Sequence, residues 1–243
     1  DACFGLLLWV PFSLLVGFHF EQLSVVIWFA LLSALLSEAF VIYALSKGHL
    51  SISGTIFSAY PLFTIFFSYF LNGERLLPLH WLFVGLTVIG ILIVSLPKKL
   101  QAGELKEKIY ILWPLAAAAT AGLSDTLSKG IIDKTSPQIF LFALAFAQIP
   151  IAIGYLLVTK QSLRQFEMAL QEFQKYKFAI LGAFLNVVTV LFLWLAFAST
   201  YASIASPITA AYPALLVALA MLLLKEKPTT RELIGLGTTV VGI

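Results

Sequence analysis

Long apolar runs separated by short polar loops constrain the fold of this chain more than any other feature of its sequence. One run, LFALAFAQIPIAIGYLLV, fills most of residues 138–159, and about 20 mostly apolar residues are enough to cross a bilayer. Of the 243 residues, 60% are hydrophobic and only 11% are charged, whereas about 25% are charged in ordinary soluble domains. The sequence therefore predicts an all-α polytopic membrane protein.

Nine segments are predicted to span the membrane. They are residues 1–17, 24–46, 51–72, 79–97, 109–132, 138–159, 177–200, 203–225 and 229–243. Most of the loops between them are short, so consecutive helices are expected to run antiparallel.

Two connections are longer than the others. Residues 98–108 are polar and join two halves of the chain. In residues 160–176, four apolar side chains stand at helical spacing among basic residues: Leu163, Phe166, Leu170 and Phe173. This pattern predicts a short amphipathic helix that lies in the membrane interface.

A sequence repeat links the two halves. Residues 51–91 align with residues 203–243 without a gap. The matched pairs include Tyr60 with Tyr212, Pro61 with Pro213, Glu74 with Glu226, Gly85 with Gly237 and Gly90 with Gly242. An odd number of predicted crossings separates the two copies, so they point in opposite directions. The repeat is thus predicted to be inverted, with a pseudo-two-fold axis in the membrane plane, as in many secondary transporters that bind substrate near the bilayer midplane.

The repeated segments also resemble a known family. YALSKGHLSISGTIFSAYPLFTIFFSYFLNGERL, followed by WLFVGLTVIGILIVS, is similar to the EamA domain of the drug/metabolite transporter superfamily. LAFASTYASIASPITAAYPALLVALAMLLLKEKPT, with ELIGLGTTVVGI, is similar to the same domain. The resemblance implies two five-helix bundles, ten helices in all. We expect a first repeat at residues 1–97 that lacks its opening helix, a linker at 98–108, and a second repeat at 109–243 that is truncated at its last helix.

Family membership would imply a secondary active transporter in the cytoplasmic membrane of a bacterium. Its substrate would be a small metabolite, such as an amino acid, a sugar or a related polar or amphipathic compound. Alternating access would be coupled to protons or would run as exchange. The alternatives are a carrier or flippase for a lipid-linked substrate and a membrane scaffold without transport. Membrane lipid is an expected partner in each case.

Charge and resemblance disagree about orientation. Most Lys and Arg residues lie in loops on the side of residue 1, and the positive-inside rule places that side in the cytoplasm. The family usually keeps both termini of its ten helices in the cytoplasm, which would place residue 1 outside.

Little in the sequence points to an enzyme or to a nucleic-acid-binding protein. Cys3 is the only cysteine, so neither an intrachain disulfide nor a cysteine-based metal site can form. His19, His49 and His80 lie in or beside loops, without the spacing of a metal site. There is no phosphate-binding loop and no Gly-x-Ser-x-Gly motif. The net charge of +3 forms no basic stripe. We expect no cofactor, no metal and no nucleic-acid partner.

Three charged residues within predicted spans are candidates for substrate or proton binding. Glu38 lies past the middle of its span, and a buried ionisable group is costly there unless it faces the bundle interior. It is either a proton site or a hydrogen-bonded lock between two helices. Asp125 and Lys129 stand at i, i+4 on one helix face. They form either a charged wall of the substrate path or a structural ion pair near the surface, and many family members carry a basic residue where Lys129 stands.

Uncharged candidates complete the predicted site. Tyr60 and Tyr212 are matched by the repeat and either offer hydroxyls to a central cavity or pack in the core. Asn186 and Thr189 are polar at mid-span and serve either the substrate or helix–helix hydrogen bonds. Tyr43 is a further candidate, although it lies about one and a half turns beyond Glu38.

Prolines are candidates for gates. Pro61 and Pro213 match in the repeat, and proline kinks a helix because it lacks an N–H donor. Matched kinks either suit paired gates or are retained from duplication of one helix. Pro207 is a further candidate for a kink.

Overall fold

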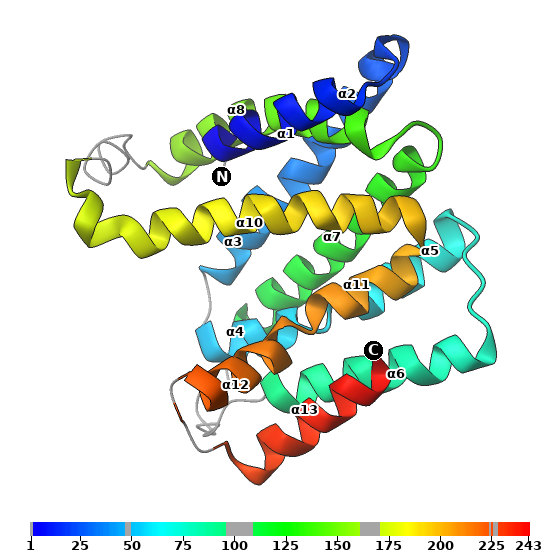
Figure 1. The fold of residues 1–243 in the computed structure, drawn as a ribbon, viewed down its shortest axis with the longest axis vertical. Helices are drawn as coiled ribbons and strands as arrows, with labels where there is room; N and C mark the ends of the chain where they lie inside the picture. The colour runs from blue at the N-terminus through cyan, green and yellow to red at the C-terminus, as the bar shows by residue number, and fades with distance from the viewer. Residues whose placement is uncertain (1, 47–49, 96–108, 161–170, 224, 226–227) are drawn as a thin grey trace. The chain divides into compact units, whose positions relative to one another are not determined.

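The computed structural model describes residues 2–46, 50–95, 109–160, 171–223, 225 and 228–243. Within these ranges all regular structure is helical. The helices, labelled as in Figure 1, are α1 (Ala2–Val16), η1 (Phe20–Gln22), α2 (Leu23–Ser33), η2 (Ala34–Ala39), α3 (Phe40–Leu45), α4 (Leu50–Phe57), α5 (Tyr60–Leu71), α6 (Pro78–Ser95), α7 (Ile109–Ile132), α8 (Pro137–Thr159), α10 (Phe173–Ser199), α11 (Ala202–Ala210), α12 (Tyr212–Leu223) and α13 (Thr230–Gly242).

The predicted spans coincide with these helices to within a few residues. Within the part of the chain that the structure describes, five helical stretches are long and apolar enough to cross a bilayer: Phe20–Leu45, Pro78–Ser95, Pro137–Thr159, Gln174–Ser199 and Ala202–Leu222. The protein is therefore an all-α polytopic membrane protein. The predicted interfacial helix at 160–176 falls largely on residues 161–170, outside the described residues, so it stays a prediction.

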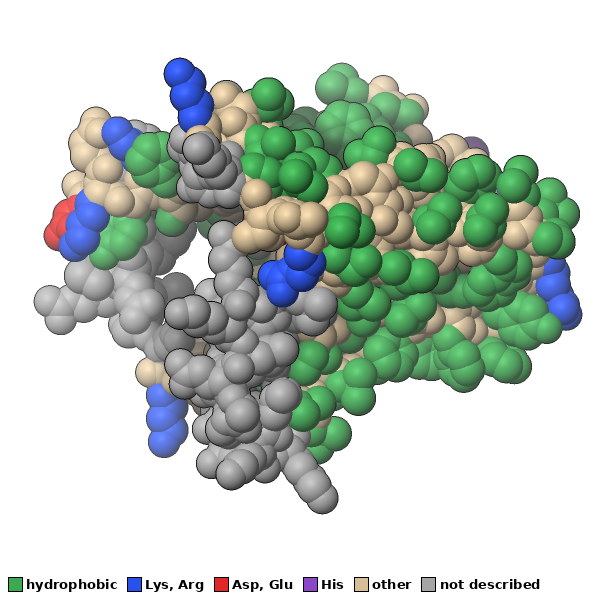
Figure 2. All heavy atoms as spheres, turned by 90° about the horizontal axis from the view of Figure 1, so that it is seen from below, with side chains coloured by type: hydrophobic (Ala, Val, Ile, Leu, Met, Phe, Trp, Pro, Cys, Tyr) green, Lys and Arg blue, Asp and Glu red, His purple; other side chains and the backbone are tan. Residues whose placement is uncertain are grey.

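Hydrophobic side chains dominate much of the described surface. Leu15 is 87% exposed, Leu222 76% and Phe178 76%. Figure 2 shows one face on which green, hydrophobic side chains cover large areas. A soluble protein rarely exposes so much contiguous apolar surface, whereas a bilayer provides it with an apolar solvent.

Local signals fix where α8 begins and ends. The Ser136 side chain accepts a hydrogen bond from the N–H of Ile139 at 3.4 Å, and Pro137 opens the helix. Serine is a preferred N-cap, and proline suits the first helical position because no intrahelical partner is lost there. Lys160 ends the helix in the left-handed region, at φ 55°.

Both copies of the repeated span are interrupted at matching positions. α4 ends at Phe57 before α5 begins, and α11 ends at Ala210 before α12 begins. At the first break the Ala59 N–H donates to the Ile56 carbonyl at 3.1 Å, and at the second the Ala211 N–H donates to the Ile208 carbonyl at 3.2 Å. Ala59 and Ala211 are counterparts in the repeat. A proline follows two residues later in each copy, and its missing N–H favours a break there.

The chain divides into two compact units, which draw helices from both sequence halves. The first unit comprises residues 1–35 and 128–199, and the second comprises residues 36–127 and 200–243. The predicted repeat boundaries at 97 and 109 flank residues outside the described part, and they stay a prediction.

The first unit is built on α8, against which α1, α2 and α10 pack. Trp9 is fully buried, and its indole N–H donates to the Val187 carbonyl on α10 at 3.0 Å. Trp194 stands edge-on to Phe140 with ring centroids 5.0 Å apart. These large side chains give the unit an aromatic core, in which one polar N–H is satisfied by backbone.

The second unit contains the α6–α13 seam, the most extensive packing between two helices in the described structure. The two helices lie side by side in Figure 1. A methyl group added at Gly90 would lie 2.5 Å from the Thr239 nitrogen, and one at Gly242 would lie 2.7 Å from the Phe83 carbonyl oxygen and closer still to Thr87. Such approaches require glycine, as is common where membrane helices pack through small residues.

The seam has two-fold symmetry. Gly90 meets Thr239 and Gly242 meets Thr87, and each of these contacts is the image of the other in the repeat. Gly235 meets Val94 further along, so the residue number rises along α6 as it falls along α13. The two helices are therefore antiparallel and related by an axis across them, which is the inverted arrangement predicted from the sequence.

Candidate functional site

A polar stripe runs along α5 in the second unit. Its four side chains are spaced by four residues, which places them on one face of the helix. They are Tyr60, Thr64, Ser68 and Asn72. Thr64 and Ser68 have no exposed surface, so this face of an otherwise apolar helix is turned into the unit.

A glycine on α7 brings that helix against the stripe. A methyl group added at Gly122 would lie 2.6 Å from the Thr64 nitrogen and 2.8 Å from the carbonyl carbon of Phe63. The absence of a side chain therefore lets the two backbones approach. One turn further along α7, Asp125 and Thr126 meet the same stripe.

Asp125 lies at the centre of a buried cluster of oxygens. Its Oδ2 accepts hydrogen bonds from the Thr64 hydroxyl at 3.2 Å and the Ser206 hydroxyl at 3.0 Å. The two hydroxyls are 3.1 Å apart. Asp125 is 6% exposed, and neither hydroxyl residue is exposed at all. These three residues, from α7, α5 and α11, form what we call the Asp125 cluster.

Tyr60 borders the cluster. Its hydroxyl lies 3.5 Å from the Ser206 carbonyl oxygen, to which it donates, and its ring stacks on Phe57 with centroids 5.5 Å apart. Tyr60 therefore joins the first turn of α5 to α11 beside the helix break.

Hydroxyl groups allow the Asp125 cluster to hold either charge state. An ionised carboxylate accepts from both hydroxyls, whereas a protonated one donates to a hydroxyl oxygen that can also accept. The ion pairs among the described residues are Lys129–Asp133 and Lys175–Glu172, so Asp125 has hydroxyl partners and not a cationic one. The arrangement can take up and release a proton, or bind a cationic group of a substrate.

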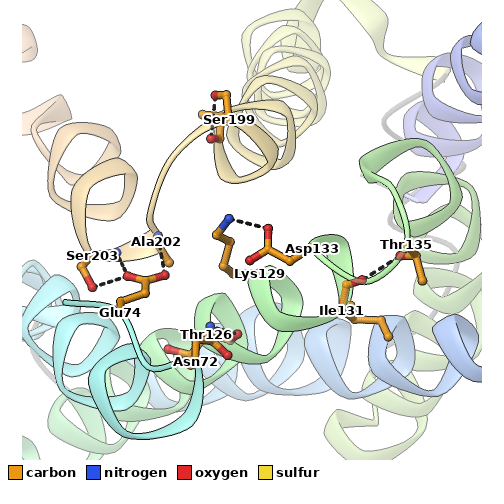
Figure 3. A network of polar contacts seen from close by, with 11 residues as sticks. Asn72, Glu74, Thr126, Lys129, Ile131, Asp133, Thr135, Ser199, Ala202 and Ser203 are labelled. Atoms are coloured by element: carbon orange, nitrogen blue, oxygen red, sulfur yellow. Dashed lines mark hydrogen bonds and ion pairs between the residues drawn. The ribbon is translucent and has the colours of Figure 1, made fainter. Parts of the chain in front are cut away.

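The remaining polar contacts of the stripe tie α5 to α7. Ser68 and Thr126 share a hydrogen bond between their hydroxyls at 3.1 Å. The Asn72 side chain donates to the Thr126 carbonyl at 2.9 Å, as Figure 3 shows. These bonds fix the helix pair that carries Asp125 and Thr64.

Lys129 does not pair with Asp125 as the sequence suggested. Its ammonium group lies 2.5 Å from Asp133, the residue that directly follows α7. Lys129 is 6% exposed, whereas the Asp133 side chain is 48% exposed. Asp125 and Asp133 both stand four residues from Lys129. Lys129 pairs with Asp133, whose carboxylate is more exposed to solvent and therefore costs less to keep ionised.

Glu38 lies in the π-helix η2 and is half-buried. Such segments are rare and often mark functional sites. Tyr43 on α3 is also half-buried and stands edge-on to Trp113 with centroids 5.7 Å apart. Both residues belong to the second unit, as the Asp125 cluster does.

Three predicted candidates are exposed. Tyr212 opens α12 and is 48% exposed, although its counterpart Tyr60 reaches into the unit. Asn186 and Thr189 lie on α10 in the first unit, and the Thr189 hydroxyl donates to the Leu185 carbonyl at 2.9 Å. None of the three belongs to the Asp125 cluster.

The candidate prolines lie at or near the helix breaks. Pro61 is buried in the first turn of α5, and Pro213 is half-buried in the first turn of α12. Pro207 is buried within α11, directly after Ser206, and lines a pocket of about 180 Å³ between α6, α11 and α13. Of the residues that the structure describes, no three His, Cys, Asp or Glu side chains group as metal ligands do.

Sequence reasoning missed Thr64 and Ser206. Thr64 could have been found from its four-residue spacing to Tyr60, but the repeat gives no hint, because its counterpart is Leu216. The counterpart of Ser206 is Gly54. Neither hydroxyl partner of Asp125 is thus repeated in the other copy, although the helices that carry them are.

Replacing Ser206 by Ala should destabilise the protein by about 1–3 kcal/mol, because a buried carboxylate loses one of its two donors. The measurement is thermal unfolding in detergent. Thr209→Ala is the matched control on the same helix, since the Thr209 hydroxyl bonds only to the Ala205 carbonyl. Equal unfolding temperatures for the two variants would contradict the described role of Ser206.

Comparison with known proteins supplies a family and a fold. A model of the EamA-like transporter family matches residues 2–96 and 108–243. The crystal structure of one protein superposes with a TM-score of 0.68 at 18% sequence identity, covering 99% of this chain and 83% of the other. That likeness concerns the fold alone. No curated protein sequence matches the chain.

Proposed function

We propose that this chain, which belongs to the EamA-like transporter family, is a secondary active transporter of a small polar or amphipathic metabolite, such as an amino acid or a sugar. It works by alternating access, coupled to protons or run as exchange, in the cytoplasmic membrane of a bacterium. The observation that carries the proposal is the Asp125 cluster, a buried carboxylate held by two hydroxyls inside a membrane protein.

Burial of this group supports a functional role. Ionisable residues within membrane spans are costly and commonly mark substrate or proton pathways. The carboxylate and its partners come from three helices, and two of these helices, α5 and α11, adjoin the breaks of the inverted repeat. Transporters with inverted repeats often form their sites at such discontinuous helices.

The substrate search begins with binding. Purified full-length protein is screened by thermal shift against amino acids, sugars, nucleotides and cationic drugs, because a ligand that binds the folded state raises the unfolding temperature. Each ligand found is then tested for uptake into proteoliposomes with and without a pH gradient. Uptake driven by the gradient supports proton coupling, and gradient-independent counterflow supports exchange. Binding without any flux contradicts the proposal.

A flat screen would favour the lipid-linked alternative. The same protein would then be reconstituted with fluorescent lipid-linked sugars, and their movement between leaflets would be followed. Movement of the labelled lipid between leaflets would show that the substrate is lipid-linked and not a soluble metabolite.

Glu38 is the second proposed proton site. We expect Glu38→Gln to flatten the dependence of uptake on pH, because glutamine keeps the shape and polarity of the side chain but cannot exchange a proton at neutral pH. Initial rates are measured over a range of external pH. Glu172→Gln serves as the control, because this exposed carboxylate pairs with Lys175 at the start of α10. An unchanged pH profile would rule out Glu38 as a proton site.

A further inference from the structure

The Glu74 carboxylate is buried against the start of α11. Its Oε1 accepts a hydrogen bond from the Ala202 N–H at 2.9 Å, and its Oε2 accepts from the Ser203 N–H at 2.9 Å and the Ser203 hydroxyl at 2.5 Å. Glu74 is only 5% exposed. Figure 3 shows both oxygens turned towards the first turn of α11.

The end of α5 is shaped to present this carboxylate. Gly73 adopts φ 68°, in the left-handed region that glycine enters without strain. The Glu74 N–H donates to the Ser68 carbonyl at 3.2 Å, and the Asn72 side chain holds the Thr126 carbonyl of α7. The backbone that leads into Glu74 is therefore held by these contacts.

The start of α11 needs such a partner. The first N–H groups of a helix have no intrahelical acceptor and carry partial positive charge. Tyr201, the residue before α11, supplies no side-chain cap. Glu74 supplies two acceptor oxygens from a distant part of the chain, and hydrogen bonds to a charged acceptor are stronger than neutral ones.

We infer that Glu74 is a positioning residue for the Asp125 cluster. Its carboxylate clamps the first turn of α11 to the end of α5, and Ser206 follows Ser203 by one turn on the same helix. The clamp thereby sets the Ser206 hydroxyl against Thr64 and Asp125. The effect of Glu74 on transport rests on the proposed function. The contact between Glu74 and α11 can be measured without a substrate.

Hydrogen exchange measures the clamp directly. In full-length Glu74→Gln protein, the first amides of α11 should exchange about 10-fold faster than in the wild type, because one of two backbone N–H donors loses its acceptor. Glutamine retains only one acceptor oxygen, whereas Glu74→Asp retains two and should restore part of the protection. Unchanged exchange in residues 202–206 of Glu74→Gln would overturn the clamp, whatever happens to transport.

The chain offers a matched control for this variant. Glu232 also caps a helix, since its carboxylate accepts from the Thr229 N–H at 2.7 Å at the start of α13, but this cap is exposed. Glu232→Gln should leave exchange in α11 unchanged. If Glu74→Gln protein cannot be purified, Ser203→Ala removes only the hydroxyl donor and should give a smaller increase in exchange in the same residues.

Coupling to Ser206 tests the positioning role. The affinity for the ligand found by screening is compared in wild type, Glu74→Gln, Ser206→Ala and the double variant. If Glu74 acts through Ser206, Glu74→Gln should weaken binding about 10-fold alone but have little further effect in Ser206→Ala, because residues that act on one network are not additive. If the effects of Glu74→Gln and Ser206→Ala on affinity simply add, the positioning role is overturned. The clamp between Glu74 and α11 would still stand on the exchange data. Absence of flux in the wild type would count against the proposed function only.

Discussion

Replacement of Asp125 by Asn should abolish most of the uptake driven by a pH gradient, because an amide cannot take up and release a proton at neutral pH. Asparagine is nearly the same size, and its amide can accept from one hydroxyl of the cluster and donate to the other. The variant should therefore fold, bind ligand and still exchange labelled for unlabelled ligand across the membrane. It should lose only the step that requires a proton to move.

Asp133→Asn is the control for this experiment. Asp133 is an acidic residue near the end of the same helix, but it is half-exposed and pairs with Lys129. Concentrative uptake and counterflow are measured in proteoliposomes for both variants at matched protein content. Retention of gradient-driven uptake by Asp125→Asn would show that the proton is carried elsewhere, with Glu38 the next candidate. Loss of counterflow together with uptake would instead make Asp125 a substrate ligand.

Alanine at Gly90 or Gly242 should lower the unfolding temperature by about 5–10 °C. An added methyl group at either position meets backbone of the facing helix, and overpacking costs about 1–3 kcal/mol. In a chain of this size about 1 kcal/mol corresponds to 2–4 °C. The backbone at the seam cannot move aside as a flexible side chain could. The loss of stability should therefore lie towards the upper end of about 1–3 kcal/mol.

The repeat provides its own controls for the seam. Gly85 and Gly237 are the preceding glycines of the same two helices, and a methyl group added at either would point into open space, away from the facing helix. Alanine there should leave stability unchanged or raise it, because glycine is the poorer helix former. Melting of all four variants in one detergent gives the comparison. Equal losses at all four positions would contradict the described close packing.

The helices were predictable because each membrane-spanning helix corresponds to an apolar run that can be recognised from neighbouring residues alone. An apolar run of membrane-spanning length must form a helix in lipid, since no other acceptor satisfies its backbone. Span 109–132 therefore matches α7 at both ends. The inverted relation was also predictable, because it follows from the repeat and from the number of crossings between the copies.

The composition of the site was less predictable because it depends on which faces meet. Asp125 was identified from its charge, but its partners were not, since Thr64 and Ser206 look like ordinary small polar residues in apolar helices. Lys129 was assigned to Asp125 by spacing, although Asp133 stands at the same spacing on its other side. The packing of α5 and α11 against α7 brings two hydroxyl groups to the Asp125 carboxylate. Lys129 pairs with Asp133 instead.

The antiparallel seam restricts how chains with this architecture can change in length. Loops between α6 and α13 can grow or shrink freely, because they do not alter the direction in which either helix crosses. A whole span inserted or deleted between them would make the two helices parallel, and the paired contacts at Gly90 and Gly242 could not both form. Between these helices, membrane spans can therefore be gained or lost only in pairs.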